Sequence, residues 1–247
     1  MHSTLQNKDT LILGMMYLGN LQMKKYEHLV MNGCSFVAAM DIKLSTSKLL
    51  SKKLGCVEHN IAQPGGSNER IIRTTYDFVK NNKELKDKTI IICGLSQISR
   101  MEVFMDNNIF QLRMGTNVNT LSKHWIQRFG SKNKELENWL RTYIKYFYHE
   151  KWEMEKLSRD LIFLQTFVEK EGFDIVFFSS MLELEERENG DSWSNYNLKL
   201  DTMDELNFFQ FPNKSRSWRE FNGHGLHPND EDNKILSDLL FEHIRGL

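Results

Sequence analysis

Residues 28–36 have the sequence His28-Leu29-Val30-Met31-Asn32-Gly33-Cys34-Ser35-Phe36. The short apolar run at 29–31 ends at Asn-Gly, a pair typical of turns, so it predicts a buried strand that stops at a tight turn. Residues 37–54 carry apolar side chains at helical spacing and predict a helix. Ser35 therefore lies where a strand leads into a helix. It is either the N-cap of that helix or a functional hydroxyl at the edge of a sheet.

Three further strand-like runs alternate with helical segments along the chain. The clearest is Thr-Ile-Ile-Ile-Cys-Gly at 89–94, because a β-branched run bounded by Lys88 and Gly94 is typical of a central parallel strand. Strands are also expected at 56–62 and 173–178, and helices at 69–79, at 134–170 with a break near His149-Glu150, and at 230–244. This alternation predicts an α/β fold, in which helices cover both faces of a parallel sheet.

The chain of 247 residues is expected to form one domain, 1–247, with three additions to the core. Residues 1–23 form an N-terminal extension whose apolar patch is too short to span a bilayer and lacks the features of a signal peptide. Residues 97–152 are expected to be a helical insertion. Residues 181–222 are expected to be a lid-like loop, because a long aromatic-rich segment in a compact domain is usually a binding loop.

Aromatic residues gather in two of these additions. Trp193, Tyr196 or Trp218 is expected to contribute an aromatic wall beside Ser35. The cluster at 143–152 is expected to lie in the core instead, because it has helical spacing; it comprises Tyr143, Tyr146, Phe147, Tyr148 and Trp152.

The bulk composition excludes several classes of partner. A net charge of −1 and a pI of about 6.7 give no electrostatic basis for binding nucleic acid or an anionic membrane. Cys34, Cys56 and Cys93 form no C-x-x-C pair and lie in apolar runs, which favours reduced thiols and a cytoplasmic location. There is no phosphate-binding or dinucleotide-binding motif, and we expect no cofactor and no metal. The oligomeric state stays open.

Small and polar residues follow three of the expected strands, and a histidine lies in a late loop. The loops are Gly33-Cys34-Ser35, Pro64-Gly65-Gly66-Ser67-Asn68 and Gly94-Leu95-Ser96-Gln97. Acyl transfer by a serine needs a nucleophile, a base within hydrogen-bond reach and donors for the oxyanion. Ser35, His227 and the backbone N–H groups of Ser35 and Gly65 would provide that set.

The order of these motifs resembles the SGNH, or GDSL-type, serine hydrolases. Gly-x-Ser follows the first strand, Asn-x-x-x-x-Gly the second and a glycine turn the third, and His-Pro precedes the last helix. In detail the chain resembles a divergent branch of this family that is common in phage genomes. The stretches that carry this resemblance are Asn-Gly-Cys-Ser-Phe, Asn-Ile-Ala-Gln-Pro-Gly-Gly-Ser-Asn and Leu-His-Pro. The resemblance covers residues 26–247 and implies a flavodoxin-like three-layer α/β/α sandwich with a central parallel sheet.

The resemblance also implies roles for single residues. Ser35 would be the nucleophile of an ester hydrolase, His227 its base, and Gly65 an oxyanion donor. The substrate would be a small-molecule or glycan ester, such as an O-acylated carbohydrate, and the location would be the host cytoplasm if the chain is phage-encoded.

Two positions depart from the family pattern. The family usually has aspartate three residues before the histidine, where this chain has His224, so the site would be a Ser-His dyad or an incomplete triad unless Glu102 or Glu220 replaces the missing acid. The family's oxyanion asparagine corresponds here to Ser96. Asn68, Arg100 and Glu102 complete the candidate substrate-binding residues, although Arg100 and Glu102 would also suit a mutual ion pair.

Three functions stay open on the sequence alone. The leading one is a serine esterase; the others are a catalytically degenerate binding module and an acyltransferase that uses the same serine. His224-x-x-His227 offers two metal ligands without the rest of a ligand set. Cys34 is a possible nucleophile, but its side chain is expected to point into the core.

Overall fold

The computed structural model describes residues 24–38, 43–105, 108–113, 133–181, 206–212, 217–222 and 227–247. Its centre is a five-stranded sheet in the order β2-β1-β3-β6-β7, and every neighbouring pair is parallel. The strands are β1 (His28–Gly33), β2 (Val57–Asn60), β3 (Thr89–Leu95), β6 (Asp174–Ser179) and β7 (Phe208–Phe209). Taken along the chain, this order is 2-1-3-4-5, that of a flavodoxin-like sheet. The predicted fold class is therefore confirmed.

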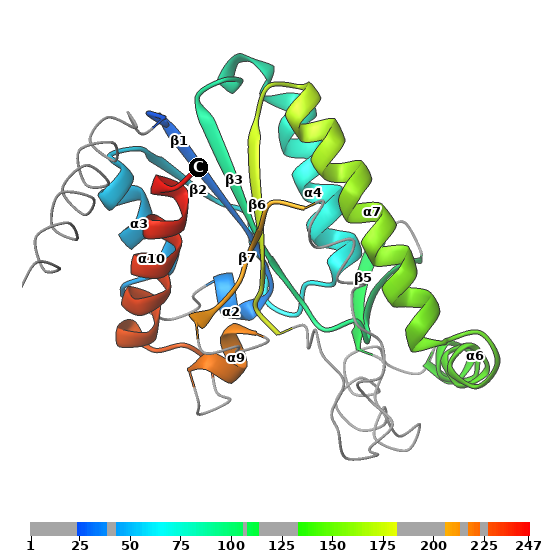
Figure 1. Cartoon of the computed structure of the whole chain (residues 1–247). Helices are drawn as coiled ribbons and strands as arrows, with labels where there is room; N and C mark the ends of the chain where they lie inside the picture. Colours follow the sequence, from blue (N-terminus) through cyan, green and yellow to red (C-terminus); the bar gives the residue numbers. More distant parts are fainter. Residues whose placement is uncertain are drawn as a thin grey trace, which may run out of the picture.

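One face of the sheet is covered by α4 (Asn68–Asn81) and α7 (Glu150–Lys170), as Figure 1 shows. Val30, Ile91 and Phe177 from the strands pack there against Ile71 of α4 and Leu161 of α7. Both helices are amphipathic, and burial of their apolar stripes stabilises this layer by about 1.5–3 kcal/mol for each large side chain.

The opposite face is covered by α3 (Thr46–Leu54) and α10 (Asp230–Arg245), with the short helices α2 (Ser35–Ala38) and α9 (Trp218–Phe221) at its lower end in Figure 1. Met31 and Ile92 pack here against Leu50 of α3 and Leu236 and Leu240 of α10. The two helices are also tied by a hydrogen bond of 2.8 Å from Thr46 Oγ1 to Asn233 Oδ1. The two covered faces make the three layers.

Capping residues explain where these helices begin. Ser45 accepts from Lys48 N at the start of α3, and Ser67 accepts from Arg70 N at the start of α4. Asn229 and Asp232 form a capping box at the start of α10. The caps therefore fix the ends of helices that lie next to the carboxyl ends of the strands.

The single helix expected over 37–54 is divided in the structure. The chain forms α2 and then α3, which begins at Thr46 because Ser45 caps it; residues 39–42 lie outside the described part. The expected break near His149 is confirmed, since α6 (Asn133–Tyr146) ends before α7 begins at Glu150.

Part of the expected helical insertion at 97–152 is a β-hairpin instead. β4 (Arg100–Met105) pairs antiparallel with β5 (Asn108–Arg113). Met101 and Val103 alternate with Arg100 and Glu102, a period of two that favours a strand over a helix at the start of β4. The short 3-10 turn η1 (Lys83–Leu85) precedes β3, and the hairpin is the next element after β3.

The expected lid at 181–222 is partly core. β7 adds an edge strand to the sheet, and Trp218 is fully buried and stacks on Phe211 and Phe221. Trp218 is therefore not available as an aromatic wall for a ligand. Trp193 and Tyr196 lie in 182–205, outside the described residues.

The aromatic cluster expected in the core is largely exposed, so that prediction was wrong. The exposed fractions of Tyr146, Phe147 and Trp152 are 66%, 67% and 55%. Helical spacing identifies one face of a helix, but it does not say whether another element covers that face.

In the part of the chain that the structure describes, no helix combines the length and the apolar character needed to cross a bilayer. The three cysteines are free thiols, and burial raises the pKa of Cys56 to about 11 and that of Cys93 to about 12.

Candidate active site

Ser35 is placed by an unusually close approach of α2 to the ends of β1 and β3. Gly33 and Gly94 are partners in the register of these strands. A Cβ on Gly33 would lie 2.5 Å from Val37 Cγ2, and a Cβ on Gly94 would lie 2.6 Å from the same atom. Only glycine at both positions lets Val37 lie directly on the two strand ends, which brings Ser35 to the edge of the sheet.

The structure brings Ser35 and His227 together, although they are 192 positions apart. His227 Nε2 lies 2.9 Å from Ser35 Oγ. The imidazole packs against the ring of Phe36, with 5.1 Å between the ring centroids, and Pro228 behind it is buried. Ser35 is half-buried and His227 is exposed, so the pair is open to solvent. A hydroxyl and an imidazole at this distance have the geometry of a nucleophile and its base.

The second ring nitrogen of His227 has no hydrogen-bond partner among the described residues. His224, the residue at the position of the family's aspartate, lies in 223–226, outside those residues. Two acids were considered as substitutes for the aspartate. Glu102 is bound by Arg73, and Glu220 is exposed on α9. Within the described residues the site is therefore a dyad.

The loop after β2 lies beside the Ser35 turn. Gln63 N donates to Gly33 O at 3.0 Å, and Gly66 N donates to Gln63 O at 3.0 Å. Gly65 has a φ of +76°, a left-handed conformation that favours glycine, and it is exposed. Its backbone is therefore open to solvent, on the same loop whose Gln63 contacts Gly33.

Asn68 and Ser96 contact each other rather than an open site. The Asn68 side chain donates to Ser96 O at 3.0 Å and accepts from Ser96 N at 2.7 Å, and both residues are buried. The Ser96 hydroxyl is buried without a hydrogen-bond partner among the described residues. We therefore assign Asn68 to holding the end of β3, and the Ser96 hydroxyl does not face a substrate in this structure.

Arg100 and Glu102 each contact other residues of the chain. Arg73 binds the Glu102 carboxylate through Nε at 2.9 Å and Nη2 at 2.7 Å, and this ion pair raises the pKa of Arg73. Arg100 extends toward Gly66 O, at 3.4 Å, and Met181 Sδ, at 3.5 Å. Glu102 therefore has a structural partner, whereas Arg100 contacts the loop after β2 and the segment after β6.

The Cys34 side chain points into the core, as expected. Its Sγ lies 3.5 Å from Ser180 Oγ and 3.6 Å from Met181 Sδ, and the residue is fully buried. It is therefore not an alternative nucleophile in this structure. No group of three or more histidine, cysteine or acidic residues suited to a metal ion occurs within the described ranges.

The sequence did not single out Asn32 as a functional position, although it lies directly before Gly33. Its fully buried amide donates to Ile71 O at 2.9 Å, Thr74 Oγ1 at 2.9 Å and Thr75 Oγ1 at 2.8 Å, and accepts from Gly33 N at 2.9 Å. The one signal for it is a polar residue that ends an otherwise apolar strand.

Comparisons with known proteins place the chain in a family without an assigned activity. Residues 43–196, more than half of the chain, match the profile described as a family of unknown function, DUF6071, and the chain belongs to that family. The matched range begins after Ser35 and ends before His227. A comparison with curated proteins found no match.

A comparison with solved structures found similar chains, two of which are described as esterases. The chain is similar to the psychrotrophic esterase EstA from a Pseudoalteromonas species, with 13% identity, coverage of 89% of this chain and 97% of that one, and a TM-score of 0.48. TesA is 12% identical, with coverage of 89% of this chain and 98% of that one and a TM-score of 0.48. The acetyl xylan esterase AlAXEase is 10% identical, with coverage of 87% of this chain and 98% of that one and a TM-score of 0.47. All three TM-scores lie below 0.5, so the fold assignment rests on the strand order of the chain itself.

Proposed function

We propose that the protein is a serine hydrolase of acyl esters, with Ser35 as the nucleophile and His227 as the general base. The observation that carries this proposal is the 2.9 Å contact between Ser35 Oγ and His227 Nε2. The pair lies at the carboxyl ends of the strands beside the point where the sheet order reverses, which is where open α/β sheets bind ligands.

The proposed reaction has two steps. Ser35 Oγ attacks the acyl carbonyl carbon while its proton passes to His227 Nε2; the ester C–O bond then breaks, and the alcohol leaves with that proton. Water next attacks the acyl-enzyme, gives a proton to His227 and releases the acid, and Ser35 regains its proton. Water is the acceptor we propose, because the pair is open to solvent.

Backbone N–H groups are the proposed donors for the oxyanion. Ser35 is the first residue of α2, so its N–H has no partner within the helix. The exposed Gly65 lies on the loop that contacts Gly33 and would provide a second donor. Donors of this kind are typically worth about 10²–10³ in kcat each.

The test is covalent labelling with a fluorophosphonate probe, combined with turnover of p-nitrophenyl acetate. We expect wild type to be labelled at Ser35 and to turn over the ester, and Ser35→Ala and His227→Ala to lose both properties. Cys34→Ala is the matched control, because it changes the neighbouring side chain, which faces the core, and it should keep the labelling.

Absence of labelling and turnover in a folded wild type would contradict the proposal and favour the binding module. Labelling combined with transfer of the acyl group to an added alcohol in preference to water would favour an acyltransferase.

A further inference from the structure

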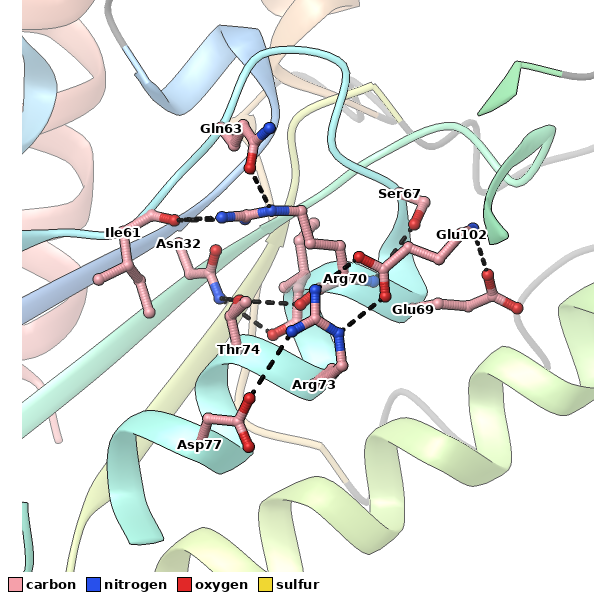
Figure 2. Close-up of polar contacts among 11 residues, drawn as sticks. Asn32, Ile61, Gln63, Ser67, Glu69, Arg70, Arg73, Thr74, Asp77 and Glu102 are labelled. Atoms are coloured by element: carbon pink, nitrogen blue, oxygen red, sulfur yellow. Dashed lines mark hydrogen bonds and ion pairs between the residues drawn. The ribbon is translucent and has the colours of Figure 1, made fainter. Parts of the chain in front are cut away.

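The first two turns of α4 contact all three strand-end loops of the candidate site. Asn32, at the end of β1, bonds to Ile71 O and to Thr74 and Thr75. Asn68 holds Ser96 at the end of β3. The loop after β2 is held by Arg70, whose side chain extends from α4 toward Ile61 and Gln63 in Figure 2.

Arg70 makes three hydrogen bonds to that loop. Its Nε donates to Gln63 Oε1 at 2.8 Å, and Nη1 and Nη2 both donate to Ile61 O at 3.2 Å. Its aliphatic stem passes below Gly66, where a Cβ would lie 3.7 Å from Arg70 Cδ. The guanidinium therefore links Ile61, the first residue after β2, to Gln63, which precedes Pro64-Gly65.

The held loop leaves little room for another arrangement. Ile61 N donates to Met31 O at 2.9 Å, and Gln63 N to Gly33 O at 3.0 Å. A Cβ on Gly66 would lie 3.0 Å from Gln63 O and 3.2 Å from Gly33 O. The position of Gly65 relative to the Ser35 turn therefore depends on contacts at residues 61, 63 and 66, and Arg70 hydrogen-bonds to the first two of these.

Arg70 is in a place where electrostatics alone would not favour it. It is the third residue of α4, and a cation in the first turn of a helix opposes the helix dipole. Partial burial lowers the pKa of Arg70, although the more distant Glu102 offsets part of this effect. Its hydrogen bonds go to a carbonyl and an amide oxygen, and among the described residues it bonds to no carboxylate. The observed effect of Arg70 at this position is to hold Ile61 and Gln63 of the loop.

We propose that Arg70 is a positioning residue that holds the Gly65 N–H at a fixed place relative to Ser35. The inference rests on the proposed esterase function for its catalytic consequence. The mechanical part, that Arg70 orders residues 61–66, stands on the contacts alone.

Arg73 gives a matched control on the same helix. It is also half-buried and hydrogen-bonded, but it pairs with Glu102 and Asp77 and makes no contact with residues 61–66 (Figure 2). Arg70→Met and Arg73→Met therefore each remove one guanidinium from α4, and only the first removes it from the loop.

Two measurements test the proposal. In p-nitrophenyl acetate hydrolysis, Arg70→Met should lower kcat by about tenfold or more with little change in KM, because oxyanion contacts form only in the transition state. Arg73→Met should keep kcat. Added guanidinium ion, at millimolar concentration, should restore part of the kcat of Arg70→Ala and none of any loss in Arg73→Ala.

The second measurement, amide hydrogen exchange over residues 61–67, needs no activity. Arg70→Met should raise exchange there more than Arg73→Met does. Equal exchange in both variants would overturn the proposal, as would an unchanged kcat in an active Arg70→Met enzyme. If wild type is inactive but the exchange difference is present, the positioning role holds and the proposed esterase function fails.

Discussion

Gly33 and Gly94 lie opposite each other at the ends of β1 and β3, and Val37 occupies the space that a side chain on either of them would need. The turn that carries Ser35 therefore requires that residues 33 and 94 have no side chain. Two strands and one helix meet there at a distance that only glycine permits.

Replacing Gly94 with alanine should both destabilise the protein and displace Ser35. The new Cβ would lie 2.6 Å from Val37 Cγ2 and 2.7 Å from Phe178 Cζ, and overpacking of a buried site typically costs about 1–3 kcal/mol. Urea denaturation measures the loss. The double variant Gly94→Ala/Val37→Ala should recover part of it, and a double variant no more stable than Gly94→Ala would contradict this account of the contact.

Asn32→Leu should lower the free energy of unfolding, because the apolar side chain leaves Gly33 N and Thr75 Oγ1 without the amide that binds them. Each buried polar group left unpaired costs about 1–3 kcal/mol. Asn81→Leu on the exposed surface of α4 is the control and should be nearly neutral. Similar denaturation midpoints for the two variants would show that the amide network contributes little.

Acidification should destabilise the protein through His59. Its pKa is lowered first by desolvation and then by His28, whose Nδ1 lies 3.1 Å from His59 Nε2, although Glu58 acts in the opposite direction. The unfolded chain therefore binds more protons below about pH 6.5, and stability falls as the pH drops through that value toward the lower folded pKa. Thermal unfolding from pH 7.5 to 5.5 should show a smaller decrease for His59→Gln than for wild type; equal slopes would contradict the assignment.

His224→Asp should raise esterase activity by about tenfold or more. Among the described residues none hydrogen-bonds to the second nitrogen of His227. A carboxylate there would stabilise the imidazolium formed as Ser35 attacks, a role whose loss costs about 10⁴ in a related triad. Turnover of p-nitrophenyl acetate is the measurement, with His224→Ala as the control. A decrease in His224→Asp would mean that His224 has a function of its own and that the loop is wrongly aligned with the family pattern.

The sheet was predictable because its strands carry a strong local signal. The β-branched run of β3 and the Asn-Gly that ends β1 fix the alternation of strands and helices, and the parallel order then brings loops distant in sequence to one edge. The meeting of Ser35 with the loop of His227 follows from that order. The helices expected at 69–79 and 230–244 lie close to the observed α4 and α10.

What could not be predicted depends on contacts between elements. The amide of Asn32 and the guanidinium of Arg70 are polar residues in unremarkable positions of the sequence, and their importance comes from a helix that packs beside them. In the same way, the burial of Trp218 and the exposure of Tyr146 depend on which neighbour covers each ring. Periodicity describes one element at a time and does not contain that information.

The long separation of Ser35 and His227 also makes the candidate site depend on docking of the C-terminal helix. The hydroxyl is synthesised early, whereas the imidazole precedes the final helix and is brought to it only when α10 docks on α3. A chain whose sheet has formed but whose α10 has not docked would lack the pair. Under the proposed esterase function, recovery of turnover during refolding should therefore coincide with docking of α10 rather than with formation of the strands, and local undocking of α10 alone should abolish turnover.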